Sequence, residues 1–436
     1  MTSAFFSRRL ALLAAVATSL FVAACGGDKD SNSGPTSVRA LNLSTDVASV
    51  DVYTDSTKRF SALATDALAT YIGLDSATYS VNVKAAGDGA TLFTRSFGLS
   101  QDQHYTALVW GRQAALNVTM LPEDEDNSGL VAGNTKLRIL NATVDTGTVD
   151  VFLTATSANL ADTQATQAGV LSGVLSGYRE LSAGTYRLRV TGEKNPNDVR
   201  LDVPAVTLAD RGATTLVLTA GAGGVLLNGT LIAQQGTATA FKNGKARVRL
   251  AAGVDAASTV SASVGGTTIS GAVASPRVGG YVLVNAGTAD LTVSINGAAL
   301  APIASSFAEG GDYTVLAYGP AASAQAVLLN DDNRLPSAAT NAKLRLVHGR
   351  NGVSPVSLTL DSQLLQPSDI VLGAASAYYA APAATAAVVE ISSQDSATTL
   401  FTRGTVDTRL TQAQGVYTVF MLGGAATPQG LWIKDR

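Results

Sequence analysis

Side chains that commonly carry catalysis or bind metals are few in this chain of 436 residues. It contains two histidines, His104 and His348, and one cysteine, Cys25. Catalytic and metal sites need such groups in clusters, and the two histidines lie in different repeats at different motif positions. No HExxH motif is present, and the segment GVLSGVLSG from Gly169 places its serine one position too late for a nucleophile elbow. We therefore expect no catalytic residue, no metal site and no cofactor.

The first strand motif occurs four times. VRALNLSTDVASVDVY begins at Val38 and returns as LRILNATVDTGTVDVF, VRLAAGVDAASTVSAS and LRLVHGRNGVSPVSLT from Leu137, Val248 and Leu344. A repeat length near a hundred residues fits a small domain better than a solenoid repeat. The sequence therefore predicts four tandem domains that resemble beads on a string. His348 occupies the place of Asn42 and Asn141 in this motif, so we interpret it as a polar residue that closes a strand end.

An arginine follows the first apolar residue of every copy: Arg39, Arg138, Arg249 and Arg345. These arginines could form a ladder of anion contacts along the chain. The alternative that we favour is structural. Each arginine would face solvent between buried neighbours and pair across the sheet with an acid such as Asp51 or Asp150.

Tyrosines and acids also recur. Tyr105, Tyr313 and Tyr417 each begin a late strand, where a tyrosine usually packs under the sheet edge and bonds its hydroxyl to the backbone. We favour that role over stacking on sugar rings. The acidic segments Glu123 to Asn127 and Asp331 to Asn333 could supply oxygen ligands for calcium, but neither has the spacing of a known loop. We favour solvated linkers for both.

The composition indicates a β-rich exported protein. Charged residues are 14% of the chain and the formal net charge is −3, which gives no basic surface for nucleic acid. Short segments alternate apolar and polar residues, with turn formers such as Gly87-Asp88-Gly89 between them. In the first repeat these segments are VRALNL, VDVYT, TYSVNVKA, TLFTRSF and YTALVWG. The sequence predicts an all-β fold of four tandem antiparallel β-sandwiches of the immunoglobulin-like kind.

The N-terminus has the pattern of an export signal. Arg8 and Arg9 precede an apolar run from Leu10 to Val22 that is too short to span a bilayer. Val22-Ala23-Ala24-Cys25 resembles the lipobox of bacterial lipoproteins, in which cleavage before the cysteine precedes its lipidation. The resemblance implies a lipid anchor, such as palmitate, on Cys25. With Gly26 rather than aspartate next, it also implies an outer-membrane location after export through the general secretory route.

The predicted division of the chain follows from these motifs and from the polar segments between them. The linkers are Leu121 to Asn134, the segment AQQGTATAFKNG that ends at Gly244, and Leu328 to Asn341. The expected ranges are 1–24 for the signal peptide, 25–36 for a flexible tether, and 37–125, 136–235, 245–333 and 343–436 for the four sandwiches.

The order V-R-x-x-N/H, VDVY, AGTYxLxV and YTVxxxG resembles the DUF4397 family, small β-sandwich modules of bacterial secreted proteins and lipoproteins. The similarity covers all four repeats, with departures at Ser261 and Ser263 and at Thr214. The family carries no established activity, so the resemblance implies no catalytic residues.

Two functions remain open from the sequence. The first is a non-enzymatic envelope lipoprotein used for binding, adhesion or surface architecture, with an envelope protein or polysaccharide as ligand. The second is a carbohydrate-processing enzyme or accessory protein whose site lies in a diverged repeat, most plausibly the third. A cleft in which acids converge would favour the second function.

Overall fold

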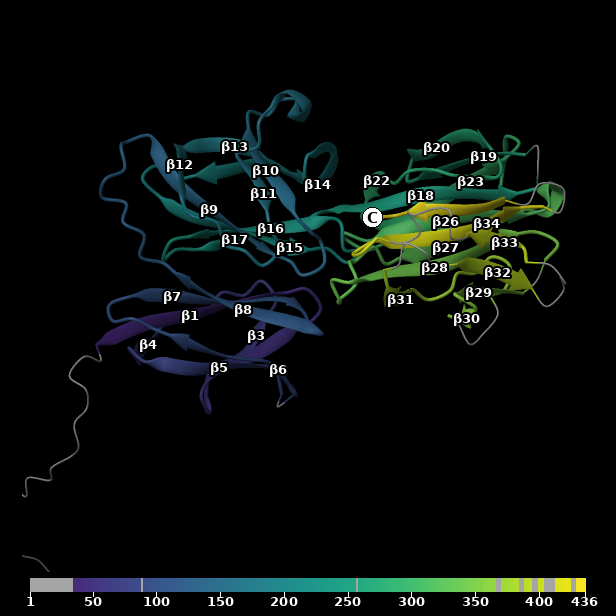
Figure 1. Cartoon of the computed structure of the whole chain (residues 1–436). Coiled ribbons are helices and arrows are strands. Elements are labelled where there is room, and N and C mark those ends of the chain that lie inside the picture. The colour runs from purple at the N-terminus through teal and green to yellow at the C-terminus, as the bar shows by residue number, and fades with distance from the viewer. Residues whose placement is uncertain are drawn as a thin grey trace, which may run out of the picture.

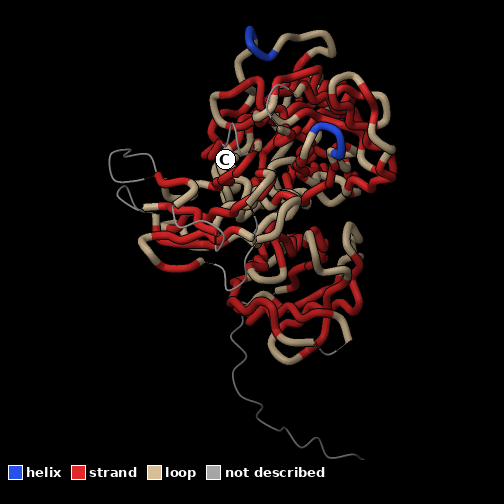
Figure 2. Tube along the Cα trace, turned by 90° about the vertical axis from the view of Figure 1, so that its right-hand side faces the viewer, coloured by secondary structure: helices blue, strands red, loops and turns tan. Residues whose placement is uncertain are grey.

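The computed structural model describes residues 34–87, 89–255, 258–353, 355–365, 370–383, 388–393, 399–403, 412–424 and 429–436. The regular structure in these ranges is strand, apart from the short 3-10 helices η1 (Leu160–Asp162) and η2 (Ala321–Ser323) (Figure 2). The strands form eight sheets, which pack in twos as four sandwiches, called modules 1 to 4 here (Figure 1). The predicted all-β sandwich fold is confirmed. The predicted signal peptide and Cys25 lie outside the described residues.

Module 1 has the sheet orders β4-β1-β7-β8 and β3-β2-β5-β6. Val50 and Val52 of β2 and Val81 and Val83 of β5 enter the core between the sheets, as a period of two requires. The strands are β1 (Pro35–Ser44), β2 (Ser49–Thr54), β3 (Thr57–Ala64), β4 (Ile72–Asp75), β5 (Thr78–Ala85), β6 (Thr91–Gly98), β7 (His104–Arg112) and β8 (Ala115–Pro122).

Module 2 repeats this plan with the orders β12-β9-β15-β16-β17 and β11-β10-β13-β14. The strands are β9 (Asn134–Ala142), β10 (Val149–Thr154), β11 (Gln167–Val170), β12 (Arg179–Ser182), β13 (Gly184–Gly192), β14 (Asn195–Leu208), β15 (Ala213–Ala220), β16 (Leu227–Ala233) and β17 (Ala238–Phe241).

Module 3 has the orders β21-β18-β26-β27 and β20-β19-β23-β24, with β22 also on β18 and β25 also on β23. The strands are β18 (Lys245–Val254), β19 (Thr259–Val264), β20 (Thr267–Ala274), β21 (Arg277–Val278), β22 (Val282–Asn285), β23 (Gly287–Ile295), β24 (Ala298–Ala299), β25 (Ile303–Phe307), β26 (Asp312–Gly319) and β27 (Gln325–Asp331).

Module 4 has the orders β31-β28-β34-β35 and β30-β29-β32-β33. The strands are β28 (Asn341–Arg350), β29 (Val356–Leu360), β30 (Gln363–Leu364), β31 (Tyr379–Pro382), β32 (Val389–Ser393), β33 (Phe401–Arg403), β34 (Val416–Gly423) and β35 (Gln429–Lys434).

The sandwiches are not antiparallel throughout. In each module the first strand pairs in parallel with the late strand, as in β1 with β7, where Val38 lies opposite Tyr105. The same parallel pairing joins β9 to β15, β18 to β26 and β28 to β34. Parallel pairing needs a long connection, and in module 1 the chain between these strands supplies all four strands of the second sheet.

The predicted tether and the predicted linker that ends at Gly244 both supply strand residues. β1 begins at Pro35 and Thr36 is buried, so the last two residues of the predicted tether belong to module 1. The predicted linker that ends at Gly244 contains β17, which pairs with β16 and adds a fifth strand to its sheet. β17 has few residues and none of them is fully buried, so its sequence shows no alternation of apolar and polar residues.

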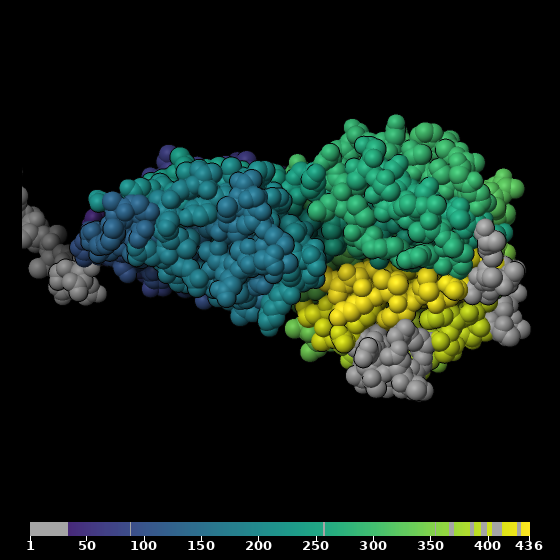
Figure 3. Space-filling view, turned by 90° about the horizontal axis from the view of Figure 1, so that it is seen from above, coloured from purple at the N-terminus to yellow at the C-terminus, as the bar shows by residue number. Residues whose placement is uncertain are grey.

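The modules are joined in two pairs rather than strung out singly. Module 1 packs on module 2 through the outer faces of their first sheets, and module 3 packs on module 4 in the same way. We call these bodies pair 1–2 and pair 3–4. Figure 1 shows modules 1 and 2 on one side of the molecule and modules 3 and 4 on the other, with the C-terminus between them, and Figure 3 shows module 2 against pair 3–4. The predicted arrangement of beads on a string is therefore wrong.

Candidate functional site

The four recurring arginines lie in the interfaces within the pairs and not in solvent. Arg39, Arg138, Arg249 and Arg345 are 4%, 6%, 2% and 2% exposed. The prediction that they face solvent and pair with Asp51 or Asp150 is wrong. Asp51 bonds Lys58, and Asp150 accepts from backbone amides. The alternation along the first strand was predicted correctly, but the face opposite the core is covered by the partner module.

In module 1 the buried arginine is held by three side chains. Arg39 Nε donates to Thr106 Oγ1 at 2.9 Å, and Nη2 donates to Glu123 Oε1 at 2.8 Å. The guanidinium lies 4.8 Å from the centre of the Tyr71 ring, and the Tyr71 hydroxyl donates to the other oxygen of Glu123. Thr106 also donates to Glu123 Oε1 at 2.7 Å. We call this set of arginine, threonine, tyrosine and acid an arginine unit.

The arginine, threonine and tyrosine recur in the other modules, with an aspartate as the acid in modules 3 and 4 and, among the described residues, no acid bonded to the arginine of module 2. The arginine donates from Nε to Thr215, Thr314 or Thr418 at 2.9, 2.9 and 3.3 Å. It lies 4.6, 4.5 and 4.7 Å from the ring centres of Tyr178, Tyr281 and Tyr378. Stacking on a ring and a fixed fork of donors suit arginine and not lysine, which explains the residue type at this position.

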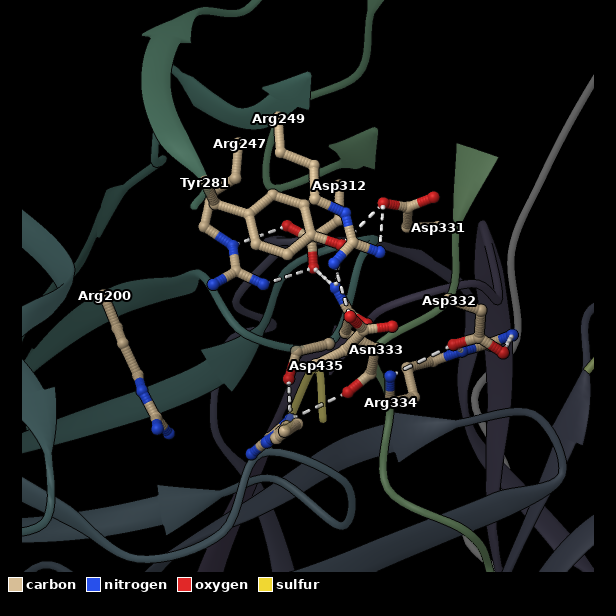
Figure 4. Close-up of polar contacts among 12 residues, drawn as sticks. Arg200, Arg247, Arg249, Tyr281, Asp312, Asp331, Asp332, Asn333, Arg334 and Asp435 are labelled. Atoms are coloured by element: carbon tan, nitrogen blue, oxygen red, sulfur yellow. Dashed lines mark hydrogen bonds and ion pairs between the residues drawn. The ribbon is translucent and has the colours of Figure 1, made fainter. Parts of the chain in front are cut away.

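In pair 3–4 the arginine of each unit forms an ion pair with an acid of the other module. Figure 4 shows Arg249 in contact with Asp331 and Asp435. Arg249 of module 3 bonds Asp435, which follows β35 of module 4, and Arg345 of module 4 bonds Asp331 of β27 in module 3. Arg249 Nη2 also lies 3.6 Å from Asp331 Oδ2. The Asp331 and Asp435 side chains are completely buried. Two cations and two anions therefore neutralise each other inside the interface.

Pair 1–2 has one acid where pair 3–4 has two. The threonine of each unit lies on the late strand, opposite a residue of the next strand in the sheet. In modules 1, 3 and 4 the acid stands two residues after that opposite residue, and in module 2 the same position is occupied by Gln234. Among the described residues, Arg138 has no ion pair, and its Nη2 donates to the Pro122 carbonyl at 2.7 Å. Burial lowers the pKa of the Arg138 guanidinium.

The electrostatics of pair 3–4 favour fixed charges. Burial opposes ionisation of Asp331, but Arg345 and Arg249 outweigh it and hold the pKa of that carboxyl below its ordinary value. Burial and the Asp331 charge raise the pKa of Tyr281 well above its ordinary value. Neither group exchanges a proton near neutral pH, so the network is suited to joining modules and not to general acid/base chemistry.

Apolar side chains surround the arginine units in both interfaces. In pair 1–2 the buried residues are Leu41, Leu43, Leu108, Trp110, Leu121, Leu140, Ala142, Val217 and Ile232. In pair 3–4 they are Ala251, Leu316, Val347, Phe420 and Leu422. Removing such surface from water stabilises association by about 25 cal/mol per Å², so each interface is a second hydrophobic core.

The tyrosines that begin the late strands take the predicted structural role. Tyr105, Tyr313 and Tyr417 are buried, and each hydroxyl accepts a hydrogen bond from a backbone amide five residues earlier. The distances are 3.2, 2.8 and 2.8 Å to Ser100 N, Ala308 N and Gln412 N. The prediction of a hydroxyl bonded to backbone is confirmed for all three.

The histidines lie far apart, in modules 1 and 4. His348 is fully buried, with Nε2 at 3.0 Å from the Val353 carbonyl, and burial lowers its pKa. This confirms the prediction of a polar residue that closes a strand end, the role that Asn42 and Asn141 fill by hydrogen bonds to backbone. His104 Nδ1 lies 2.9 Å from Asp124 Oδ1.

The acidic segments are only partly solvated linkers. Glu123, Asp331 and Asn333 are 3%, 4% and 0% exposed, which contradicts the predicted solvated character. The sequence showed polar runs but not the arginines that they meet. Within the described ranges, no three or more His, Cys, Asp or Glu side chains are grouped as a metal site requires.

A cleft of about 330 Å³ lies where modules 1, 2 and 4 meet the segment that links modules 3 and 4. Its acids are Asp145 and Asp332, neither of them in module 3. Asp145 bonds Arg112, and Asp332 bonds Arg334 and Lys343. Despite partial burial, these two cations lower the pKa of Asp332 to about 2. Both acids of the cleft are thus paired with cations.

The sequence interpretation missed the threonine, the tyrosine and the acid of each arginine unit. A signal was available for the tyrosine, because each one stands directly before the strand that pairs antiparallel with the first strand of its module, namely Tyr71 before β4, Tyr178 before β12, Tyr281 before β22 and Tyr378 before β31. The sequence gives no direct sign of the partner acids, since Asp435 meets an arginine of another module 186 positions away.

Comparison with known proteins places the chain in a family. The model described as "Domain of unknown function (DUF4397)" matches residues 36–152 and 246–359, which together make up more than half of the chain. The chain belongs to the DUF4397 family. Each match runs from the first strand of an odd-numbered module into the second strand of the next, so the DUF4397 matches begin at modules 1 and 3.

Three solved structures show weak similarity. A family 26 carbohydrate-binding module of Amy13K from Eubacterium rectale, in complex with maltoheptaose, is 14% identical, covers 48% of this chain and 96% of its own, and has a TM-score of 0.15. A candidate cell adhesion protein from Bacteroides uniformis is 12% identical, with coverages of 46% and 99% and a TM-score of 0.19. The Bacillus anthracis TIE protein is 10% identical, with coverages of 65% and 50% and a TM-score of 0.14. With TM-scores this low, the similarities do not bear on function.

No curated protein sequence matches the chain. Among the described residues, no helix has the length and apolar character needed to cross a bilayer.

Proposed function

We propose that this protein is a lipid-anchored protein of the bacterial cell envelope that serves binding or surface architecture without catalysis. The observation that carries the proposal is the use of the recurring charged residues. Four buried arginines lie in the interfaces that join the modules in pairs, and Arg39, Arg249 and Arg345 each form an ion pair with a buried acid there. Groups fixed in this way stabilise an assembly and have no free proton or nucleophile to offer a substrate.

The anchor in this proposal is Cys25. The sequence before it supports cleavage and acylation at this residue after export through the general secretory route, and Gly26 supports transfer to the outer membrane. A single acyl chain binds a membrane only marginally, whereas two or three chains add about 0.8 kcal/mol for each buried CH₂ and make attachment lasting.

The pairing of the modules supports a rigid binding surface. An arrangement of independent beads would present each module flexibly, whereas the shared apolar interfaces make each pair one rigid body. The second sheet of each module, such as β3-β2-β5-β6, lies away from its pair interface and leaves its outer face for an envelope protein or polysaccharide. A rigid body binds with less loss of conformational entropy than a flexible chain.

A carbohydrate-processing enzyme is the competing proposal, and the cleft beside Asp145 and Asp332 is the feature in its favour. A glycosidase needs one carboxyl group that keeps its proton to act as an acid. Asp332 has its pKa lowered to about 2, the opposite of that requirement. We therefore favour the non-enzymatic function.

The anchor can be tested by labelling cells with a palmitate analogue and separating the membranes. The parent chain should carry label and fractionate with the outer membrane. Cys25→Ser should lose the label and leave that fraction. The matched control is Cys25→Ser with Ser33→Cys, which restores a thiol outside the lipobox and should stay unlabelled. Labelling of Cys25→Ser, or unchanged fractionation, would contradict the anchor.

A further inference from the structure

The contacts between pair 1–2 and pair 3–4 differ in kind from those within the pairs. Every hydrophobic cluster of the described residues lies inside one module or inside one pair. Between the pairs the contacts are backbone and polar: Gly223 N donates to Gly310 O at 2.8 Å, and Leu335 N donates to Asp145 O at 3.2 Å. No hydrophobic cluster of the described residues therefore spans this junction, in contrast to the interface within each pair.

Arg436 joins the two bodies at this junction. Its backbone belongs to module 4, because Val416 N donates to the Arg436 carbonyl at 3.0 Å. Its side chain reaches module 2, where Nη1 donates to Asp145 O at 2.8 Å and to Gly224 O, and Nη2 donates to Thr146 O. Nη1 also lies 3.2 Å from Asn333 O in the segment between modules 3 and 4.

Carbonyl oxygens, and no carboxylate among the described residues, accept the hydrogen bonds of Arg436. Burial and neighbouring Arg200 lower the pKa of this guanidinium, because both disfavour its charged form. A buried cation is tolerated when its donors are satisfied, but it gains less from carbonyls than from an ion pair. The contact is thus specific in geometry, because the accepting carbonyls are fixed in the backbone of module 2 and of the segment between modules 3 and 4.

A glycine loop of module 2 makes the close approach possible. A Cβ added to Gly223 would lie 2.7 Å from Asp312 Cγ, and one added to Gly224 would lie 2.6 Å from Arg334 Cα. Any side chain at Gly223 would therefore push module 3 away from module 2. The junction depends on backbone surfaces that touch directly, with the Arg436 side chain set across them.

We infer that Arg436 is a latch that fixes pair 3–4 against pair 1–2, and that the junction is a hinge about which the two rigid pairs turn when the latch is released. The cleft beside Asp145 and Asp332 changes shape in that motion, because its walls come from both bodies. The inference goes beyond the proposed function and does not depend on the lipid anchor.

The test measures distances between spin labels in the full chain carrying Cys25→Ser, purified in detergent. Leu171 in module 2 and Leu283 in module 3 are 56% and 42% exposed. Spin labels on Leu171→Cys and Leu283→Cys therefore report how the two pairs are placed relative to each other. Leu364 in module 4 is 52% exposed, and labels on Leu283→Cys and Leu364→Cys report the distance between modules 3 and 4 within pair 3–4. The parent should give one narrow distribution for each pair of labels.

Arg436→Ala should broaden the distribution between modules 2 and 3 and leave the distribution within pair 3–4 unchanged. Gly223→Ala should do the same by an independent route. The matched control is Lys434→Ala, which removes an exposed cation that bonds only Gln412 within module 4, and both distributions should stay narrow. The inference is overturned if Arg436→Ala leaves the first distribution narrow, or if it broadens both, since Arg436 would then support module 4 itself.

Discussion

Pair 1–2 and pair 3–4 are built from the same motifs but neutralise their buried arginines differently. Pair 1–2 has the larger set of buried apolar residues and only one acid, Glu123, for two arginines. Pair 3–4 has fewer buried apolar residues and two acids, Asp331 and Asp435, that are exchanged between modules. The two interfaces therefore differ in how the buried arginine charge is balanced, by a single acid in pair 1–2 and by reciprocal ion pairs in pair 3–4.

The largest effect should follow loss of the acid that serves both arginines of pair 3–4. Asp331→Ala leaves Arg345 without its ion pair and weakens the surroundings of Arg249, and breaking a buried pair costs about 3–5 kcal/mol. Denaturant titration of the purified protein measures the loss. The control is Asp202→Asn, which breaks the exposed pair with Arg187 and should cost about 0.2–1 kcal/mol. Equal losses would refute the importance of burial here.

The next largest effect compares two arginines at the same motif position. Arg249→Met leaves Asp435 buried without its ion-pair partner and should destabilise the protein by about 3 kcal/mol. Arg138→Met leaves no carboxylate without a partner, because Arg138 donates to a hydroxyl and a carbonyl. The loss of unfolding free energy should therefore be about 1 kcal/mol or less. Both are measured by the free energy of unfolding. The comparison fails if Arg138→Met proves as costly as Arg249→Met.

The pH dependence of stability should reveal the ionised Asp331 of pair 3–4. The pKa of Asp331 is lowered in the folded protein, so its stabilising contribution is complete above its unfolded value of 3.8 and is lost as the pH falls through the folded pKa. The difference in unfolding free energy between the parent and Asp331→Asn should therefore be full at pH 6 and should shrink in strongly acidic buffer. A difference that stayed constant down to pH 2 would contradict the ionised state of Asp331.

The smallest effect concerns the late-strand tyrosines. Tyr417→Phe and Tyr105→Phe each remove an acceptor from a backbone amide and should cost about 1 kcal/mol, with Tyr417 the larger because its bond is shorter. Tyr79→Phe is the control, since its hydroxyl bonds an exposed carbonyl and its loss should stay within about 0.5 kcal/mol. A cost for Tyr79→Phe as large as that for Tyr417→Phe would argue against this role.

The sequence predicted the sandwich cores because alternation at period two marks a sheet with one covered face. It did not predict the pairing of modules, although a signal was present. The late strands contain continuous apolar runs, ALVW from Ala107 and VFML from Val419, and such runs indicate burial on both faces. Arginine within the first strand suggested solvent at the face opposite the core, and that suggestion concealed the interface.

The acids of the arginine units could not be assigned from one sequence. Glu123 and Asp435 directly follow the last strand of a module and Asp331 ends one, at places where polar residues usually mark a linker. Their partners are brought together by parallel pairing of the first and late strands and by docking of a second module. Both are long-range features that local patterns do not encode.

The central claim is that the module pair, and not the single module, is the stable unit. It is tested most directly by comparing residues 34–241 with residues 34–126, each expressed alone. The longer fragment should be monomeric, unfold in one cooperative transition and bind no hydrophobic dye. The shorter fragment exposes Leu41, Leu108 and Trp110, so it should self-associate or bind the dye and should unfold at lower denaturant concentration. A monomeric, dye-silent module 1 as stable as the pair would contradict the claim.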